Sequence, residues 1–539
     1  MTPLLKLLVA VVCVASTVTA RQSMREIQIH KQLEVLDRTE GSNTAPGVGP
    51  KYKVYWQEAS LPIDHSGEYP GNFSNRYWVM DGFYEPGGPV ISFDTGESDG
   101  GHRYIGYLTV NETFFYQYLK EFKGMGIIWE HRYYGQSKPF PVNLDTPSEQ
   151  MRFLTTENAL KDFVVFANDF KWKNFTVSPK VTPWVVIGGS YPGMRAAFLR
   201  HLYPETVYAA WASSAPVQAQ VDMSIYWEQV YRGMVRYNLG NCTRNVKLAV
   251  DYIDRQLSKS RTAAKLKQQY LGRTAEKVTN GGFADTLHYP FYWWQAEGVG
   301  EYLRSFCDHL TNGDSEVGPE WAKEEDGEGA GKLYSDRWAS WPGYVKLVNT
   351  YNPLGHCEGS TRDETAQPNC LLDGRYSGDL GISWSWQYCS EWGYFQSTNI
   401  GPHALGSRYN NQRHQQEICY RQFPDGLSSG YLPRRPRVDK MNALTDGWNM
   451  RPSNVFWTGG EFDPWLSLSP LSQEKWSPML AATPEAPRCG HTPPEGQMFG
   501  HLLENSEHCY ELRSSVESAT RPQEMFRDAL KGWLKCFGK

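Results

Sequence analysis

The sequence predicts an α/β fold in which helices cover both faces of a mostly parallel sheet, with a long insertion between two parts of the sheet. Three observations predict this class. Short, continuously apolar segments alternate with helical patterns over residues 51–218, as expected for strands buried on both faces. The alternation stops over residues 219–440, which are more polar and rich in aromatic side chains. It resumes within residues 441–539, so these are expected to complete the same domain.

The elements of the first part are expected in strand–helix order. Apolar runs predict strands at 89–93 and 126–129. A helix is expected between Leu154 and Trp172, where apolar side chains recur at helical spacing, with Thr155 or Thr156 as its cap. The later expected elements are a strand at 184–187, a helix at 194–203, a strand at 207–212, helices at 246–257 and 299–310 within the insertion, and a strand at 454–457.

The first fifty residues have the features of segments that precede a mature domain. Lys6 is followed by an apolar run too short to span a bilayer, and small residues end at Ala20, so residues 1–20 are expected to be a signal peptide. The polar residues 21–50 are expected to be a leader or propeptide. Four glycosylation sequons agree with a secretory route, at Asn72, Asn111, Asn174 and Asn241. The protein is therefore expected to be secreted or to reside in a lysosomal or vacuolar lumen, with no membrane segment.

Charge and cysteine usage exclude several function classes. The formal net charge is −5 without a basic block, so nucleic acid is not an expected partner. No cysteine or histidine cluster has zinc-site spacing, so no metal is expected. Nine of the ten cysteines remain once Cys13 leaves with the signal peptide, and disulfides are expected among them. The odd number leaves at least one thiol unpaired, for which Cys536 is one candidate, and the pairing stays open.

Ser190 is a candidate nucleophile. It stands in the glycine-rich stretch 188–193, between an expected strand and an expected helix. A tight turn of this kind lifts a serine hydroxyl out of a sheet and aims a helix N-terminus beneath it. The alternative is an ordinary turn without chemistry, since the usual G-x-S-x-G pattern has glycine where Pro192 stands.

A serine nucleophile needs a base, and the base needs an acid that orients it. In the α/β-hydrolase arrangement the acid and then the histidine follow the serine along the chain. Asp463 fits the acid because it follows the expected strand at 454–457, with Glu461 as a competitor. His508 fits the base because it lies near the C-terminus. His501 and His491 compete with it.

These residues resemble the prolyl carboxypeptidase and dipeptidyl peptidase II family of serine peptidases, also called the lysosomal Pro-Xaa carboxypeptidase family. The resemblance covers roughly residues 51–535, and the long chain and cysteine-containing histidine loop are similar to a fungal branch that includes prolyl endopeptidases. It departs at Pro192 and in the long proline-rich stretch before His508. The matching motifs are Gly188-Gly189-Ser190-Tyr191-x-Gly193-Met194, Asp463-Pro464-Trp465, His508-x-x-Glu511-Leu512, Glu130-His131-Arg132-Tyr133-Tyr134-Gly135-Gln136-Ser137 and Trp386-Gln387-Tyr388-Cys389-Ser390-Glu391.

The resemblance implies an α/β-hydrolase domain with an inserted, mainly helical cap that overhangs the site. It also implies hydrolysis of the bond after proline, with Ser190, His508 and Asp463 as the catalytic residues. Hydroxyl, imidazole and carboxylate suffice for acyl transfer, so no cofactor is expected. The expected partners are proline-containing peptides or proteins.

The oxyanion hole is expected beside the serine. The main-chain N–H of Tyr191 directly follows the nucleophile and is one expected donor. The second is expected from Gly96–Glu97, whose loop resembles the family's T-G-x-E-G loop. Met194 and Trp465 match the family's proline-pocket residues, and the alternative is that both belong to the ordinary core.

Two further segments have alternative predicted roles. Trp386, Gln387 and Glu391 belong to the expected cap, where they either hold the far end of the substrate or only pack the cap against the hydrolase domain. The segment Glu130-His131-Arg132 is expected to form a buried ion-pair network rather than to act in catalysis.

The sequence leaves the mode of cleavage open between endopeptidase, carboxypeptidase and dipeptidyl peptidase. Two other functions remain as alternatives: an esterase or lipase on the same fold, and a catalytically inactive binding protein. The chain is expected to be a monomer or a homodimer, and no exposed coiled-coil pattern argues for dimerisation.

Overall fold

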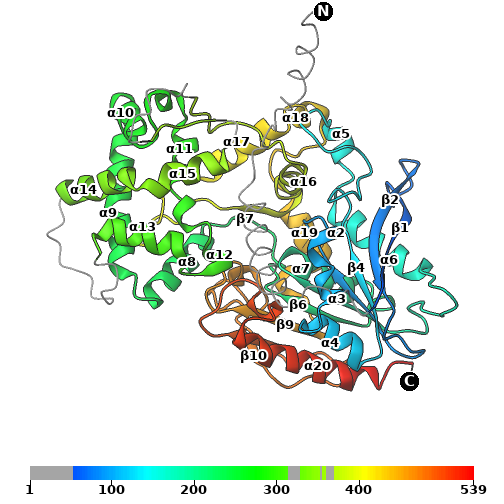
Figure 1. Ribbon diagram of the computed structural model, residues 1–539. Coiled ribbons are helices and arrows are strands. Elements are labelled where there is room, and N and C mark those ends of the chain that lie inside the picture. Colours follow the sequence, from blue (N-terminus) through cyan, green and yellow to red (C-terminus); the bar gives the residue numbers. More distant parts are fainter. Residues whose placement is uncertain (1–51, 314–327, 353–354, 360–368, 539) are drawn as a thin grey trace, which may run out of the picture.

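The computed structural model describes residues 52–538 apart from 314–327, 353–354 and 360–368. The expected signal peptide and leader, residues 1–20 and 21–50, lie outside the described residues. A twisted sheet with its flanking helices forms one part of the molecule, and a group of helices lies beside it (Figure 1). No helix in the described part of the chain is long and apolar enough to cross a membrane.

The central sheet has nine strands in the order β1-β2-β4-β3-β5-β6-β9-β11-β10. The pairs β1–β2 and β2–β4 are antiparallel, and the other neighbours are parallel. This arrangement confirms the predicted α/β-hydrolase class. The strands are β1 (Val54–Pro62), β2 (Asn72–Met80), β3 (Val90–Asp94), β4 (Met125–Trp129), β5 (Trp184–Gly189), β6 (Ala209–Ser213), β9 (Val455–Gly460), β10 (Ala481–Thr483) and β11 (Gln497–Leu503).

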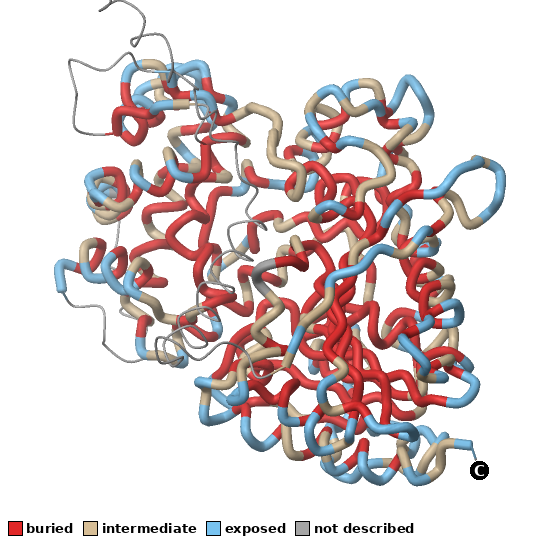
Figure 2. The backbone as a smooth tube through the Cα atoms, turned by 45° about the vertical axis from the view of Figure 1, so that its right-hand side comes forward, coloured by how far each residue is buried: buried red, intermediate tan, exposed pale blue. Residues whose placement is uncertain are grey.

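Alternate residues of each central strand pack against helices on opposite faces of the sheet. In β5, Val185 and Ile187 join the core that contains helices α4 and α20, whereas Trp184 and Val186 join the core that contains α6 and α7. Burial on both faces explains why these strands are continuously apolar. Figure 2 shows buried backbone running through the centre of this part, with exposed segments at its rim. The helices of this part are α2 (Gly101–Tyr104), α3 (Gly106–Thr109), α4 (Phe114–Glu121), α5 (Ser148–Met151), α6 (Thr156–Asp169), α7 (Tyr191–Leu202) and α20 (Thr520–Leu534).

The chain between β6 and β9 is mainly helical, and we call residues 219–440 the cap. Its two short strands, β7 (Gln220–Asp222) and β8 (Gly393–Phe395), pair parallel with each other. The cap boundaries themselves stay a prediction. Its helices are α8 (Ile225–Arg236), α9 (Gly240–Leu257), α10 (Ser260–Leu271), α11 (Asn280–Thr286), α12 (Trp294–Glu297), α13 (Glu301–Thr311), α14 (Glu328–Ser340), α15 (Pro342–Tyr351), α16 (Asp379–Gln387), α17 (Gln412–Gln422) and α18 (Gly426–Ser429). Helix α19 (Val438–Thr445) begins within the cap and ends beyond it.

The predicted elements are confirmed, with shifted ends. Thr155 is the cap of α6, since its side-chain oxygen accepts the N–H of Asn158 at 3.2 Å. Helix α7 begins at Tyr191, three residues before the expected start, because the turn at Ser190 leads into helical geometry immediately. Strand β6 begins at Ala209 rather than at residue 207.

Four disulfides form within the described residues, and Cys509 is the free cysteine there. Cys536, one candidate for the unpaired thiol, is instead bonded to Cys489. Helix α20 brings the C-terminal end against the proline-rich segment, where the indole N–H of Trp533 donates to the carbonyl of Pro487 at 2.9 Å. The disulfides are Cys242–Cys307, Cys357–Cys370, Cys389–Cys419 and Cys489–Cys536.

The four predicted glycosylation sites differ in exposure. Asn72, Asn111 and Asn174 are exposed, whereas Asn241 is half-buried in the first turn of α9. Glycosylation of these four residues stays a prediction.

Candidate active site

Ser190 stands in a strained turn between β5 and α7. Its φ of 67° and ψ of −129° form a combination that residues with a Cβ rarely adopt. Its N–H donates to the carbonyl of Ser213 at 2.8 Å, at the end of the neighbouring strand β6. A Cβ at Gly193 would lie 2.5 Å from that same oxygen, so the helix passes too close to β6 for a larger residue. The turn therefore holds Ser190, 6% exposed, at the carboxyl edge of the sheet.

Asp463 and His508 form a buried pair. Nδ1 of His508 lies 2.8 Å from Oδ1 of Asp463, and neither residue is exposed. The N–H of Trp465 donates to the same Oδ1 at 2.9 Å, which holds the carboxylate in place. Because a carboxylate oxygen only accepts, Nδ1 carries the hydrogen and Nε2 is the nitrogen able to take up a proton.

The pKa of His508 reflects two opposing effects. Burial lowers it, but the Asp463 carboxylate and the neighbouring Cys509 thiol outweigh burial and raise the pKa above its ordinary value. The imidazolium form of His508 is therefore stabilised where it lies. An imidazole that must hold a proton transiently benefits from this environment.

The histidine loop lies directly against the serine turn. A Cβ at Gly189 would lie 2.9 Å from Sγ of Cys509, the residue after His508. The N–H of Cys509 also donates to Oγ of Ser214 at 2.9 Å, next to the residue that anchors Ser190. Ser190 and His508 therefore stand on neighbouring segments fixed to the same end of β6.

Glu511 fastens the histidine loop to the sheet. Its Oε1 accepts hydrogen bonds from Oγ of Ser213 at 2.6 Å and from Oγ1 of Thr458 at 2.5 Å. These hydroxyls belong to β6, whose last residue Ser213 anchors Ser190, and to β9, which precedes the Asp463 loop. Burial raises the pKa of Glu511. Its role was missed from the sequence, where it was only part of a matching motif.

The competing residues lie elsewhere. Glu461 is half-buried and accepts the N–H of Asn505 at 2.9 Å, and no contact joins it to a histidine among the described residues. His501 is half-buried within β11, and His491 is exposed. Of the candidate acid–base pairs, the structure brings together Asp463 and His508.

The loop expected to complete an oxyanion hole packs on the serine turn. A Cβ at Gly96 would lie 2.3 Å from Cγ of Pro192, so Pro192 fills the space that only a glycine leaves open. The N–H of Gly96 donates to Oδ1 of Asp94 at 2.9 Å, and Oδ2 of Asp94 accepts from Nε of Arg195 at 2.8 Å. The Gly96 N–H is thus engaged, which favours the following Glu97 N–H as the donor on this loop.

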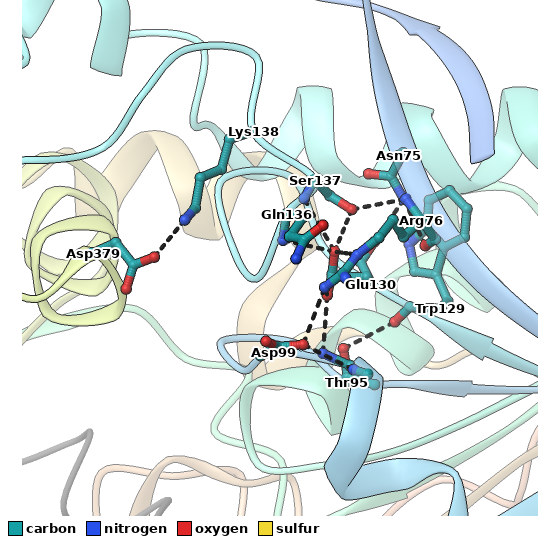
Figure 3. A network of polar contacts seen from close by, with 12 residues as sticks. Asn75, Arg76, Thr95, Asp99, Trp129, Glu130, Gln136, Ser137, Lys138 and Asp379 are labelled. Atoms are coloured by element: carbon teal, nitrogen blue, oxygen red, sulfur yellow. Dashed lines mark hydrogen bonds and ion pairs between the residues drawn. The ribbon is translucent and has the colours of Figure 1, made fainter. Parts of the chain in front are cut away.

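Glu130 organises the other end of that loop (Figure 3). Its carboxylate accepts from Nη2 of Arg76 at 2.6 Å, from Oγ of Ser137 at 2.6 Å and from the N–H of Gly100 at 3.0 Å. Asp99 also accepts from Nη2 of Arg76, at 3.1 Å. The segment after β3 is therefore tied to β2 and to the end of β4 through one buried carboxylate, as expected for a structural ion-pair network.

The hydroxyl of Tyr191 joins the serine turn to the cap. Nε2 of Gln387 donates to it at 2.6 Å, and Nε2 of His131 lies 2.9 Å from it. Tyr134 donates in turn to Oε1 of Gln387. Burial and the Arg195 guanidinium lower the pKa of His131 well below its ordinary value, so this imidazole is neutral. The fully buried Gln387 thus contacts the residue after Ser190.

Glu391 attaches the cap to the α/β domain, whereas Trp386 stabilises the cap itself. Glu391 accepts from the N–H of Thr156 at 2.9 Å and from its Oγ1 at 2.8 Å, at the first residue of α6. The ring of Trp386 packs edge-on against Phe423, with centroids 5.0 Å apart. Both residues are buried.

Met194 and Trp465 are linked by a third aromatic residue, Tyr394 of the cap. The hydroxyl of Tyr394 lies 3.8 Å from Sδ of Met194 and donates to the carbonyl of Pro216 at 2.5 Å. Its ring meets that of Trp465 edge-on, with centroids 5.2 Å apart. Sequence reasoning missed Tyr394, because no local pattern indicates that it contacts Met194, 200 positions away in the sequence.

Comparison with known proteins identifies the family to which the chain belongs. A family model described as Serine carboxypeptidase S28 matches residues 63–287 and 349–495. The chain belongs to this family of serine peptidases, which confirms the resemblance drawn from its motifs.

Similar proteins span most of the chain. It is 28% identical over 495 residues to a probable extracellular serine carboxypeptidase of Arthroderma benhamiae, covering 86% of this chain but only 65% of that relative. It is 27% identical over 473 residues to the lysosomal Pro-X carboxypeptidase of Homo sapiens, covering 86% of both chains. The solved proline iminopeptidase of Mycobacterium smegmatis matches with 13% identity and a TM-score of 0.33, covering 88% of this chain and 99% of that one.

Proposed function

We propose that the protein hydrolyses peptide bonds on the carboxyl side of proline through a triad of Ser190, His508 and Asp463. The observation that carries the proposal is the buried Asp463–His508 hydrogen bond on a loop packed against the Ser190 turn. In this proposal, a hydroxyl, an imidazole and a carboxylate act together at the carboxyl edge of the mostly parallel sheet, where α/β proteins bind ligands. The names of relatives that act as serine or Pro-X carboxypeptidases add support.

The chemistry follows from these groups. Nε2 of His508 takes the proton of the Ser190 hydroxyl as Oγ attacks the scissile carbonyl carbon. His508 then passes the proton to the leaving amine, and the acyl group stays on Oγ as an ester. A water molecule, deprotonated by His508, attacks the carbonyl carbon of this ester. His508 returns that proton to Oγ of Ser190 as the bond to the acyl group breaks and the acid product leaves. Asp463 keeps the imidazole in the required tautomer throughout.

The oxyanion is stabilised by two main-chain donors in this proposal. The N–H of Tyr191 starts helix α7 directly after the nucleophile. The N–H of Glu97 is the second, supported by the packing of its loop on the serine turn and by the engagement of Gly96 with Asp94.

In this proposal, three apolar side chains close to the nucleophile and the acid determine the specificity for proline. Met194, Trp465 and Tyr394 are buried together beside the segments that hold Ser190 and Asp463. Aromatic faces and a thioether suit a rigid, apolar pyrrolidine ring. A linear, charged side chain would lose its hydration there without gaining a polar partner.

The proposed setting is extracellular or lysosomal. Four disulfides are typical of proteins that mature in an oxidising compartment. Two relatives are named as extracellular and lysosomal enzymes. The proposed substrates are proline-containing peptides or proteins, cleaved without a cofactor by a monomer or homodimer.

Mass spectrometry of peptide cleavage tests the proposal. The substrates are peptides with a single internal proline, each with free and blocked termini, and matched peptides with alanine in its place. We expect cleavage after proline, at least tenfold faster than after alanine, and no cleavage by the Ser190→Ala variant. Equal rates for proline and alanine, or faster turnover of simple esters than of any peptide, would contradict it. The blocked termini separate endopeptidase, carboxypeptidase and dipeptidyl modes in the same experiment.

A further inference from the structure

Gln295 belongs to the cap, yet it contacts both loops of the candidate active site. It lies in α12 and is completely buried. Its carbonyl oxygen accepts the N–H of His508 at 3.3 Å. Its side-chain Oε1 accepts the indole N–H of Trp465 at 2.9 Å. Gln295 therefore lies between the proposed base and the proposed wall of the proline pocket.

The segment around Gln295 is held firmly on these loops. The indole N–H of Trp294 donates to the carbonyl of Phe462 at 3.0 Å, one residue before Asp463. Nη1 of Arg513 donates to the carbonyl of Ala296 at 2.9 Å. Three consecutive cap residues are thus hydrogen-bonded to the acid and histidine loops. A side chain on such a backbone has a fixed position, which is what a substrate-binding group requires.

The orientation of the Gln295 amide follows from its neighbours. An indole N–H can only donate, so the end of the amide that faces Trp465 is the oxygen. The hydroxyl of Tyr226 lies 3.2 Å from the same oxygen. The nitrogen Nε2 is therefore at the other end, and it is buried without a hydrogen-bond partner among the described residues. A buried donor that lacks an acceptor lowers stability, so its presence calls for a functional reason.

The chemistry of an Xaa–Pro substrate supplies the missing acceptor. Proline has no N–H, so the polar group nearest to its ring on the acyl side is the carbonyl oxygen of the preceding residue. That oxygen can only accept hydrogen bonds, and Nε2 of an amide can only donate. Because Gln295 is hydrogen-bonded to the indole of Trp465, a proline ring bound against Trp465 would bring the Xaa–Pro amide close to the Gln295 side chain.

We propose that Gln295 is a substrate-binding residue whose Nε2 donates a hydrogen bond to the carbonyl oxygen of the residue before proline. This inference rests on the proposed function. It assigns to the cap a part in recognising the substrate, in addition to covering the site. It also predicts that the protein requires an acylated proline and does not act on proline with a free ring nitrogen.

A substrate pair tests the hydrogen bond directly. The two peptides share one Xaa-Pro sequence and one leaving group, and differ only in oxygen or sulfur at the Xaa carbonyl. Sulfur of a thioamide keeps the shape and accepts hydrogen bonds weakly. We expect the wild-type protein to show kcat/KM about five to ten times lower for the sulfur peptide, the usual effect of one net hydrogen bond. The Gln295→Met variant should hydrolyse the two peptides at equal rates.

Two further variants guard against effects on folding. Gln295→Glu keeps an oxygen for the indole of Trp465 but lacks the N–H donors, so it should also lose the preference for oxygen. Gln268→Met alters an exposed glutamine of α10 and should keep the wild-type preference. A purely structural role for Gln295 would lower both rates and leave their ratio unchanged.

The outcomes distinguish this inference from the function on which it rests. If the wild-type protein cleaves neither peptide, the proposed function is overturned, and this inference falls with it. If the wild-type protein cleaves both equally fast, or if Gln295→Met and Gln295→Glu retain the full preference for oxygen, only the hydrogen bond from Gln295 is overturned. Loss of the preference in both variants and its retention in Gln268→Met supports the proposal.

Discussion

Nδ1 of His508 lies 2.8 Å from Oδ1 of Asp463 across 45 residues of chain, and solvent reaches neither side chain. The pair is held from three sides. Trp465 donates to the carboxylate, Cys509 is bound to Ser214, and Gln295 of the cap accepts the main-chain N–H of His508. The imidazole can therefore turn little, which is what a general base beside a strained serine needs.

Replacing the carboxylate of this pair tests its role. Asp463→Asn keeps the size of the side chain but lets the amide nitrogen face Nδ1, which favours the wrong imidazole tautomer. We expect kcat to fall by about 10³–10⁴, as for other triads, with the fold retained. Asp446→Asn is a matched control, because Asp446 holds His201 at 2.9 Å in an exposed pair elsewhere. A similar kcat for Asp463→Asn and the wild type would rule Asp463 out as the orienting acid.

Glu507, the residue before His508, makes stability depend on pH. Burial raises the pKa of Glu507 to about 7, despite a hydrogen bond from the hydroxyl of Tyr237 at 3.1 Å. A carboxyl group whose pKa is higher in the folded state stabilises the fold below its unfolded pKa of 4.5, and this contribution is lost as pH rises through 7. It amounts to at most about 3 kcal/mol.

Urea unfolding at pH 5 and pH 8 checks this effect. The free energy of unfolding of the wild type, relative to Glu507→Gln, should be higher at pH 5 than at pH 8. The comparison with the variant is needed because buried His288, whose pKa burial lowers to about 3, acts in the opposite direction below pH 6.5. Glu495→Gln alters an exposed glutamate and should follow the wild type. The prediction would be contradicted if the wild type and Glu507→Gln differed in free energy of unfolding by the same amount at pH 5 and at pH 8.

The Glu130 network should contribute strongly to stability. Glu130→Gln places an amide nitrogen among six donors and leaves the half-buried Arg76 with Asp99 as its remaining charged partner. We expect the free energy of unfolding to fall by about 3–5 kcal/mol. The kcat should fall as well, because the loop that carries Gly96 loses an anchor.

A second ion pair in the same view is the control for Glu130 (Figure 3). Lys138 and Asp379 join the α/β domain to α16 at a partly exposed position. Asp379→Asn should therefore change the free energy of unfolding by about 1 kcal/mol or less. If Glu130→Gln and Asp379→Asn lowered the free energy of unfolding equally, burial of the Glu130 network would not increase its contribution to stability.

The free thiol gives a chemical check of the disulfide pairing. Under denaturing, non-reducing conditions, iodoacetamide should label Cys509 and leave the other eight cysteines of the described residues unlabelled. Reduction should then expose those eight. Peptide mapping that finds label on Cys489 or Cys536 before reduction would contradict the pairing of the C-terminal helix with the proline-rich segment.

Local signals were sufficient to predict the α/β part of the fold. The apolar run before Ser190 and the threonine before α6 act within a few residues, so the sequence displays them directly. The positions of Asp463 and His508 after late strands also follow from chain order, although their catalytic roles stay a prediction.

Contacts between distant segments could not be predicted in the same way. The Cys489–Cys536 disulfide depends on how α20 packs, which no local pattern encodes. The contacts of Gln295 with Trp465 and of Tyr394 with Met194 depend on how the cap packs against the α/β domain. Such contacts arise from tertiary packing, and only the folded structure reveals them.

Covalent labelling of the nucleophile tests the central claim most directly. The native protein is treated with a fluorophosphonate, which reacts with an activated serine hydroxyl, and the labelled peptide is identified by mass spectrometry. We expect a single phosphonylated residue, Ser190, with peptide hydrolysis lost in proportion to labelling and no label on Ser190→Ala. Label on a different serine, or hydrolysis that continues in Ser190→Ala, would contradict the account.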